Sequence, residues 1–227
     1  RQVIFQDDED CKKYLQCIAQ CKTISGFTLH AYCLMGNHIH LLIEVKVEDL
    51  DQIFKRIGVR YAYWYNWKYM RSGHLFQDRF KSEPINDDAS FIAVLRYIYQ
   101  NPVKAGLCKN PEDYIWSSYN KQGAYLPLTD CNKALELLSE AEFRAFLAQS
   151  NEEQFLDIEA DTRLNDREAA SMIKVVCNVE SLSDFHHLPA EQQTTFILEL
   201  HKKRCSIRQL VRLVGISKGH IERILRN

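Results

Sequence analysis

The 227-residue chain lacks the features of several protein classes. No stretch approaches the ~18 consecutive apolar residues that cross a bilayer, and the first ten residues, RQVIFQDDED, do not have the form of a signal peptide. No two of the eight cysteines form a CxxC pair, so a disulfide framework or a zinc site is not indicated. There is no P-loop, internal repeat or low-complexity tract. We expect a cytoplasmic protein with reduced thiols and no membrane contact.

The formal net charge of −1 is the sum of three segments of different sign. Residues 1–125 carry 16 basic and 14 acidic side chains (+2), residues 126–200 carry 5 and 15 (−10), and residues 201–227 carry 8 and 1 (+7). A basic end of this kind favours contact with nucleic acid. The acidic middle is either a helical spacer or an anionic segment that docks on a basic face until DNA displaces it.

The first half of the chain alternates between helix and strand patterns. Two β-rich runs, residues 27–35 and 38–45, are separated by Gly36-Asn37, which has the turn chemistry of a two-residue hairpin loop. Helical patterns cover residues 7–23, 47–69 and 87–100, where Asn101-Pro102 is expected to end the third helix, and residues 75–85 alternate as a strand.

This order of elements predicts an α+β fold, in which an antiparallel sheet carries helices on one face. One further strand before Arg1 would make the unit ferredoxin-like, with the order βαββαβ. From about residue 126 only helical patterns follow, over residues 129–150, 167–178 and 190–203, interrupted by an acidic stretch at 151–166. The C-terminal region is therefore expected to be all-α.

Residues 205–226 have the pattern of a helix-turn-helix. Apolar residues mark two helices, Gly215 marks the turn, and Ser217 is a natural N-cap for the second helix. If that helix enters the major groove, the DNA contacts are Ser217, Lys218, Gly219, His220 and Arg223. The alternative is a basic helix pair that packs on the acidic middle.

His38 and His40 are the first candidate site residues. Because side chains alternate along a strand, both imidazoles leave one face about 7 Å apart and could ligate one divalent ion. The alternative is two polar residues on a solvated face, or one hydrogen-bonded core histidine. Tyr97 and Asn101 lie four apart on one helix face, where an Asn oxygen could ligate Mg²⁺ or Mn²⁺ and the tyrosine could be a nucleophile or a packing residue.

Two segments are candidates for contact with a DNA strand. Residues 55–71 interleave basic side chains, Arg60 among them, with six aromatic residues, a mixture that can stack bases and attract phosphates. For most of these aromatics, packing of an amphipathic helix is the preferred interpretation. Arg79 and Lys81, which alternate on the third expected strand, are better candidates for phosphate contacts.

Four motifs in order resemble the single-tyrosine HUH transposases, in particular the branch of the REP-associated tyrosine transposases. They are GNHIHLL at 36–42, RYAYWYNWKYMRSGHLFQDRFKS at 60–82, YIYQNPVKAGL at 97–107 and WSSY at 116–119. The resemblance covers about residues 1–120. It implies that His38, His40 and Asn101 bind the divalent metal ion, and that Tyr97 is the nucleophile with Tyr99 as its companion.

The resemblance also implies the reaction, which is cleavage and rejoining of hairpin-bearing single-stranded DNA through a 5′-phosphotyrosine intermediate in the bacterial cytosol. The chain divides accordingly into a catalytic domain (1–125), an acidic helical middle region (126–189) and a helix-turn-helix domain that holds duplex DNA (190–227). A homodimer is possible in this family. The alternatives are a domesticated, non-catalytic DNA-binding regulator and a metal-dependent nuclease without a covalent step.

Overall fold

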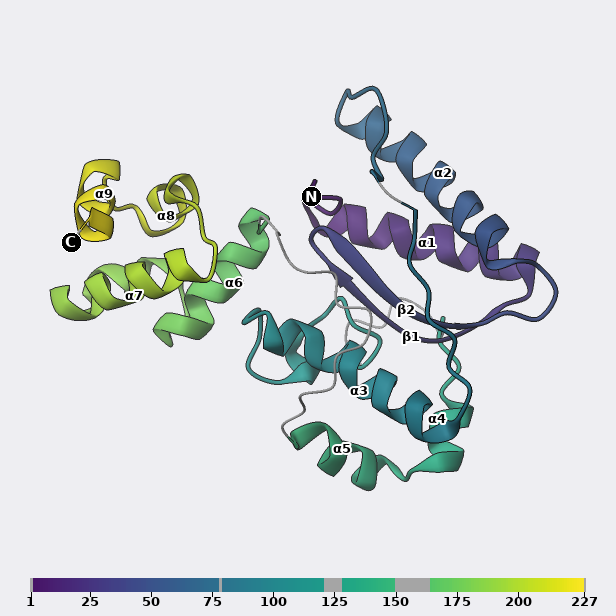
Figure 1. Cartoon of the computed structure of the whole chain (residues 1–227). Helices are drawn as coiled ribbons and strands as arrows, with labels where there is room; N and C mark the ends of the chain where they lie inside the picture. Colours follow the sequence, from purple (N-terminus) through teal and green to yellow (C-terminus); the bar gives the residue numbers. More distant parts are fainter. Residues whose placement is uncertain (1, 78, 121–127, 150–163, 227) are drawn as a thin grey trace.

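The computed structural model describes residues 2–77, 79–120, 128–149 and 164–226 (Figure 1). In chain order the elements are α1 (Asp8–Ser25), β1 (Thr28–Met35), β2 (His38–Glu44), α2 (Leu50–Lys68), α3 (Asp88–Lys104), α4 (Asn132–Leu137), α5 (Glu140–Ala148), α6 (Asp166–Cys177), α7 (Ala190–Lys202), α8 (Ile207–Val214) and α9 (Lys218–Arg226), with short 3₁₀ turns at Pro111–Asp113 and Leu182–His187. The α+β class and the helical C-terminal region are confirmed. None of the helices in these ranges combines the length and apolar composition needed to cross a membrane.

The β1–β2 hairpin is the centre of the first half. The two strands pair antiparallel, with Met35 opposite His38, so Gly36-Asn37 is the two-residue loop expected from the sequence. Helices α1 and α2 lie on one side of the hairpin and α3 on the other (Figure 1). The outer edge of β1 is covered by the WSSY segment, whose Trp116 carbonyl accepts a hydrogen bond from the Leu34 amide at 2.9 Å.

The expected strand at residues 75–85 is wrong. In the described part of this segment no residue is in a strand, and no backbone hydrogen bond joins it to β2. It is held by side chains instead, since Leu75 is buried and Phe80 stacks on Phe54 of α2 with ring centroids 4.5 Å apart. Alternation alone does not make a strand, because the backbone also needs a ladder partner at hydrogen-bonding distance. The further strand expected before Arg1 stays a prediction.

The expected end of the third helix is also wrong. Helix α3 continues through Pro102 to Lys104, and the Ala105 amide still donates to the Asn101 carbonyl at 2.9 Å. A proline near the end of a helix keeps a helical φ and removes only one hydrogen bond, so the last turn survives. The helix that carries Tyr97 therefore also carries Asn101 and Lys104.

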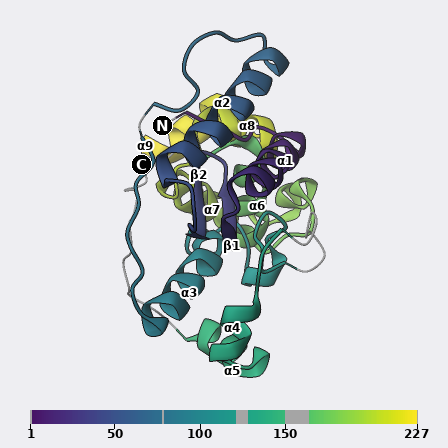
Figure 2. The ribbon, with the colours of Figure 1, turned by 90° about the vertical axis from the view of Figure 1, so that its right-hand side faces the viewer.

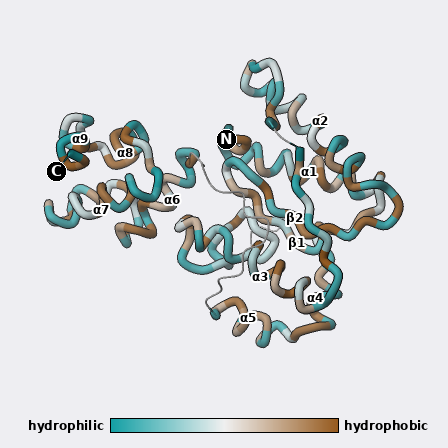
Figure 3. The backbone as a smooth tube through the Cα atoms, viewed as in Figure 1, coloured by the Kyte–Doolittle hydropathy of each residue, from teal (hydrophilic) through white to brown (hydrophobic). Residues whose placement is uncertain are grey.

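Hydrophobic contacts divide the described chain into two cores. The first joins α1 to α5 with the hairpin, and the second joins α6 to α9. Figure 2 shows α4 and α5 at the end of the molecule away from α2, and Figure 3 shows hydrophobic and hydrophilic stretches alternating along α6 to α9. The three-part division drawn from charge stays a prediction; the second core includes α6, which charge alone places in the acidic middle. Residues 151–163 of that middle lie outside the described residues.

All eight cysteines are free thiols, as expected, and only Cys131 is exposed. Burial raises the pKa of Cys11 and Cys108 to about 12. These thiols therefore stay protonated near neutral pH and act as small apolar side chains.

Candidate active site

The two histidines of β2 face Tyr97 of α3. The ring centroids of His38 and His40 are 4.8 Å apart, and the Tyr97 ring meets His40 edge-on at 5.5 Å between centroids. Strand alternation puts both imidazoles on the α3 side, while Ile39 packs against the first core on the other. A lone HxH motif does not predict this meeting; it depends on how α3 packs across the hairpin.

The surroundings of the two imidazoles bear on whether they could hold a metal ion. Burial lowers the pKa of His40 to about 4, and its Nε2 is buried without a hydrogen-bond partner among the described residues. His38 Nδ1 lies 2.7 Å from the Asn37 side-chain oxygen, and because that oxygen only accepts, Nδ1 is the donor of this hydrogen bond. An unpartnered buried nitrogen on His40 beside a second imidazole fits a divalent metal ion.

The third expected ligand makes a different contact. Asn101 is on the same helix as Tyr97, and its side-chain nitrogen donates to the Tyr97 backbone carbonyl at 2.9 Å. This bond uses the amide nitrogen and not the amide oxygen, which is the atom that would ligate a metal. The described residues contain no cluster of three or more His, Cys, Asp or Glu side chains that could hold a metal ion. An ion here would therefore depend on the two histidines, an amide oxygen and the substrate.

Tyr97 and Tyr99 lie in different surroundings, although both are buried. The Tyr99 hydroxyl accepts a hydrogen bond from Ser118 at 3.3 Å, and its ring packs on Tyr119. Tyr97 instead contacts His40, and the Lys104 ammonium lies 5.3 Å from its ring centroid. Of the two tyrosines, only Tyr97 is placed beside the histidines.

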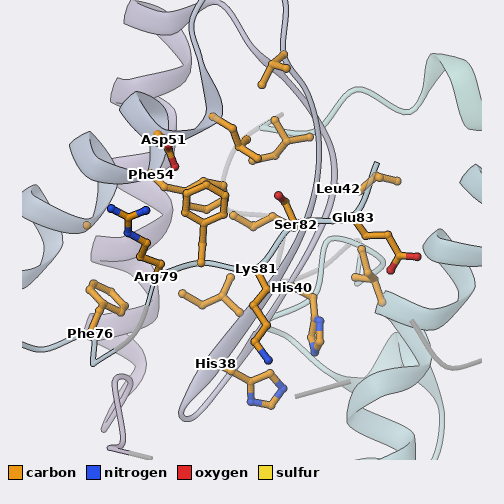
Figure 4. Close-up of a pocket in the computed structure, with 18 of the residues that line it drawn as sticks. His38, His40, Leu42, Asp51, Phe54, Phe76, Arg79, Lys81, Ser82 and Glu83 are labelled. Carbon is orange, nitrogen blue, oxygen red and sulfur yellow. The ribbon is translucent and has the colours of Figure 1, made fainter. Parts of the chain in front are cut away.

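A groove of about 1060 Å³ extends from the histidines between β2, α2 and the segment after α2 (Figure 4). Lys81 lines it and points toward the end where His38 and His40 lie, whereas Arg79 extends toward α2 (Figure 4). The groove wall is otherwise largely apolar, with the Phe54–Phe80 stack at its centre. Of the two expected phosphate contacts, Lys81 is thus the one near the site.

The remaining predicted DNA contacts lie outside this site. Arg60 is exposed on α2, a helix on the other side of the hairpin from α3 (Figure 1). Ser217, Lys218, His220 and Arg223 are all exposed around the start of α9, and the Ser217 hydroxyl accepts from the His220 amide at 3.4 Å, as an N-cap does. The structure brings together His38, His40, Tyr97, Asn101 and Lys81. Arg79 lies further along the same groove, whereas Arg60 and the α9 residues lie on two separate surfaces.

Three residues near the site were not anticipated from the sequence as site residues. Asn37 accepts a hydrogen bond from His38 and is part of the GNHIHLL motif, while Lys104 lies two helical turns beyond Tyr97. Glu168 of α6 accepts a hydrogen bond from the Gly36 amide at 2.5 Å, two residues before His38. The spacing of seven residues from Tyr97 could have suggested that Lys104 lies near the site. Nothing in the sequence indicates the contact between Glu168 and Gly36.

Comparison with known proteins agrees with the chemistry of this site. Residues 1–101 match the family model described as "Transposase IS200 like". A Haemophilus influenzae protein named as a putative REP-associated tyrosine transposase is 33% identical over 107 residues, a match that covers 42% of this chain and 60% of that protein. A comparison with solved structures finds no match.

The matched region contains the hairpin, both histidines, Tyr97 and Asn101. Over residues 1–101, less than half of the chain, the sequence is therefore similar to the IS200-like transposases. The resemblance to the tyrosine transposases seen in the sequence is confirmed at this level. Helices α6 to α9 lie beyond the matched residues.

Proposed function

We propose that the chain is a metal-dependent DNA strand transferase that cleaves and rejoins hairpin-bearing single-stranded DNA through a 5′-phosphotyrosine at Tyr97. The observation that carries this proposal is the contact of the Tyr97 ring with His40, 5.5 Å between centroids, beside a second imidazole 4.8 Å further on. A nucleophile next to two imidazoles that could hold a divalent ion suits phosphoryl transfer.

His38, His40 and the Asn101 oxygen would hold Mg²⁺ or Mn²⁺, which when bound withdraws charge from the scissile phosphate. Lys81 would bind the neighbouring phosphate at the site end of the groove. The Tyr97 hydroxyl oxygen forms a bond to phosphorus as the bond from phosphorus to the 3′-oxygen breaks. The phenol proton leaves to water and the departing 3′-oxygen takes up a proton. A 3′-hydroxyl of the same or another strand reverses these steps, so the phosphodiester energy is conserved.

The C-terminal unit would hold the duplex part of the substrate. Lys218, His220 and Arg223 are exposed on α9. The second core holds this helix beside α8. Helix N-termini that present basic residues suit binding of phosphates and of base edges in the major groove. In this proposal the protein works in the bacterial cytosol, where its DNA is.

The test is a covalent-adduct assay. The protein is incubated with end-labelled single-stranded DNA that carries a hairpin, with Mg²⁺ or Mn²⁺, and resolved on denaturing gels. We expect a shifted protein–DNA band that is absent in Tyr97→Phe, absent with chelator and strongly reduced in His40→Ala. Circular dichroism of each variant verifies that it is folded.

Other outcomes would identify the alternatives. Cleavage that persists in Tyr97→Phe would exclude the phosphotyrosine route and indicate a metal-dependent nuclease. Tight DNA binding by the wild type with neither cleavage nor adduct would indicate a non-catalytic regulator built on the transposase scaffold.

A further inference from the structure

The aromatic residues of α2 fall on two faces of the helix. Tyr61 and Tyr65 are buried in the first core, as the amphipathic interpretation expects. Tyr63 and Trp67 point the other way and are 80% and 73% exposed. They are four residues apart, so their rings lie one above the other on the helix surface, and Val59, 62% exposed, continues the row. Two large exposed aromatics in a row are not explained by packing within the chain.

The surface around these rings is basic. Between residues 52 and 77 the sequence has five Lys or Arg residues and no Asp or Glu. Lys13 and Arg60 line a groove of about 490 Å³ that runs between α1 and α2 beside Tyr63 and Trp67. Among the described residues, none that lines this groove is acidic. Lys68 does not add to this charge, because it pairs with Asp10 at 2.9 Å and with other acidic residues at the start of α1.

We propose that this face of α1 and α2 is a second DNA-binding surface, on which unpaired bases stack on Tyr63 and Trp67 while Arg60 and Lys13 bind the phosphates. Aromatic faces bind bases that are exposed in a single strand, whereas the bases of a duplex are already stacked on one another. Charge also argues against a second copy of this chain as the occupant. A two-fold interface here would bring Arg60 and Lys13 of both copies together with no acidic residue to offset them.

The inference rests on the proposed function, since it assigns a further part of the same single-stranded substrate. Figure 1 shows α2 on the opposite side of the hairpin from α3, which carries Tyr97. A strand that reaches both places must pass around the edge of the domain. Contacts so far from the reacting phosphate strengthen binding equally before and during the reaction, so they lower the dissociation constant without changing the chemical step.

The test is single-stranded DNA binding by the full chain, measured as fluorescence anisotropy of a labelled oligo-dT without a hairpin. Tyr63→Ala and Trp67→Ala are each expected to weaken binding about tenfold, while Tyr63→Phe, which keeps the ring, binds as the wild type does. Arg60→Gln should flatten the dependence of binding on salt by close to one phosphate contact. Leu198→Ala on α7, an apolar residue 45% exposed, is the control for loss of surface area alone.

Two results would overturn the inference. One is unchanged oligo-dT binding in the Tyr63→Ala/Trp67→Ala double variant. The other is concentration-dependent dimerisation of the wild type that this double variant abolishes, which would assign the surface to a second copy. The adduct assay on wild type separates the two proposals. An adduct in the wild type together with unchanged oligo-dT binding in the double variant refutes only this surface, whereas weakened binding in the double variant with no adduct in the wild type refutes only the transferase.

Discussion

Tyr97 and Tyr99 show how two residues of one helix, two positions apart, can have unrelated roles. On a helix such residues point to different sides, so one meets the hairpin histidines and the other meets the 114–119 segment. The sequence alone leaves each of them open to either role. The structure separates them by neighbour, since His40 contacts Tyr97 and Ser118 contacts Tyr99.

Tyr99→Phe is therefore expected to affect folding and not chemistry. It removes the hydroxyl that accepts the Ser118 hydrogen bond inside the first core, which should lower the free energy of unfolding by about 1 kcal/mol. Adduct formation at Tyr97 should persist. Urea unfolding and the adduct assay, run on the same preparation, measure both effects. Loss of the adduct in a stably folded Tyr99→Phe protein would contradict the assignment of roles.

At the scale of elements, the first turn of α6 packs against the β1–β2 hairpin. Asn165 and Glu168 cap α6 reciprocally, with the Glu168 amide donating to the Asn165 side chain at 2.7 Å. The same two side chains reach across the molecule, Glu168 to the Gly36 amide at 2.5 Å and Asn165 to the Phe5 carbonyl at 2.9 Å. Glu168 is 5% exposed, and burial raises the pKa of its carboxyl. Gly36 is the residue that permits this approach.

Gly36→Ala should consequently detach α6 from the hairpin. A Cβ at position 36 would overlap the Glu168 carboxylate and the Asn165 amide, and we expect a loss of about 1–3 kcal/mol of stability from this overpacking. The thermal unfolding midpoint should fall, and small-angle scattering should show a larger radius as the C-terminal unit separates.

Gly58→Ala on α2 is the matched control. Its Cβ would meet only Phe76, at an ordinary 3.8 Å, and within a helix alanine is favoured over glycine. We expect equal or higher stability and an unchanged radius. If Gly36→Ala behaves as this control does, the docking of α6 on the hairpin is incorrect.

What the sequence could predict is what depends on near neighbours. The loop Gly36-Asn37, the N-cap Ser217 and the turn at Gly215, which has a φ of +70°, follow from local residue chemistry and are found where expected. The prediction of a strand at 75–85 was wrong because a strand needs a neighbouring strand to pair with, and alternation within the segment does not show whether one is there. Capping of α6 by Asn165 was visible in the N-x-x-E spacing at 165–168, but its contact with Gly36, 132 residues away, depends on the fold as a whole.

At the scale of the whole molecule, α6 joins the two cores at both of its ends. Its first turn contacts the hairpin at Gly36, and beyond its last turn Asn178 accepts a hydrogen bond from Lys109 at 2.6 Å, shortly after α3. Both segments that carry the site are thus held to the unit that contains α8 and α9. DNA bound by α9 would be kept in a fixed orientation relative to Tyr97. The basic C-terminal segment would in this way position the DNA for a reaction at Tyr97.

The strongest test of that arrangement is the salt dependence of duplex binding. Deleting residues 201–227 should lower affinity and flatten the salt dependence, but it also removes Leu210 and Ile221 from the second core and so confounds charge with folding. Lys218→Gln/Arg223→Gln changes only exposed side chains of α9. Removing one bound phosphate should reduce the slope of log affinity against log salt by about one unit, so the double variant should reduce it by about two. Arg144→Gln on α5, where the arginine pairs with Glu140, is the control for loss of a positive charge away from α9 and should leave the slope unchanged. An unchanged slope in the α9 variant would assign the basic C-terminus to packing instead of to DNA.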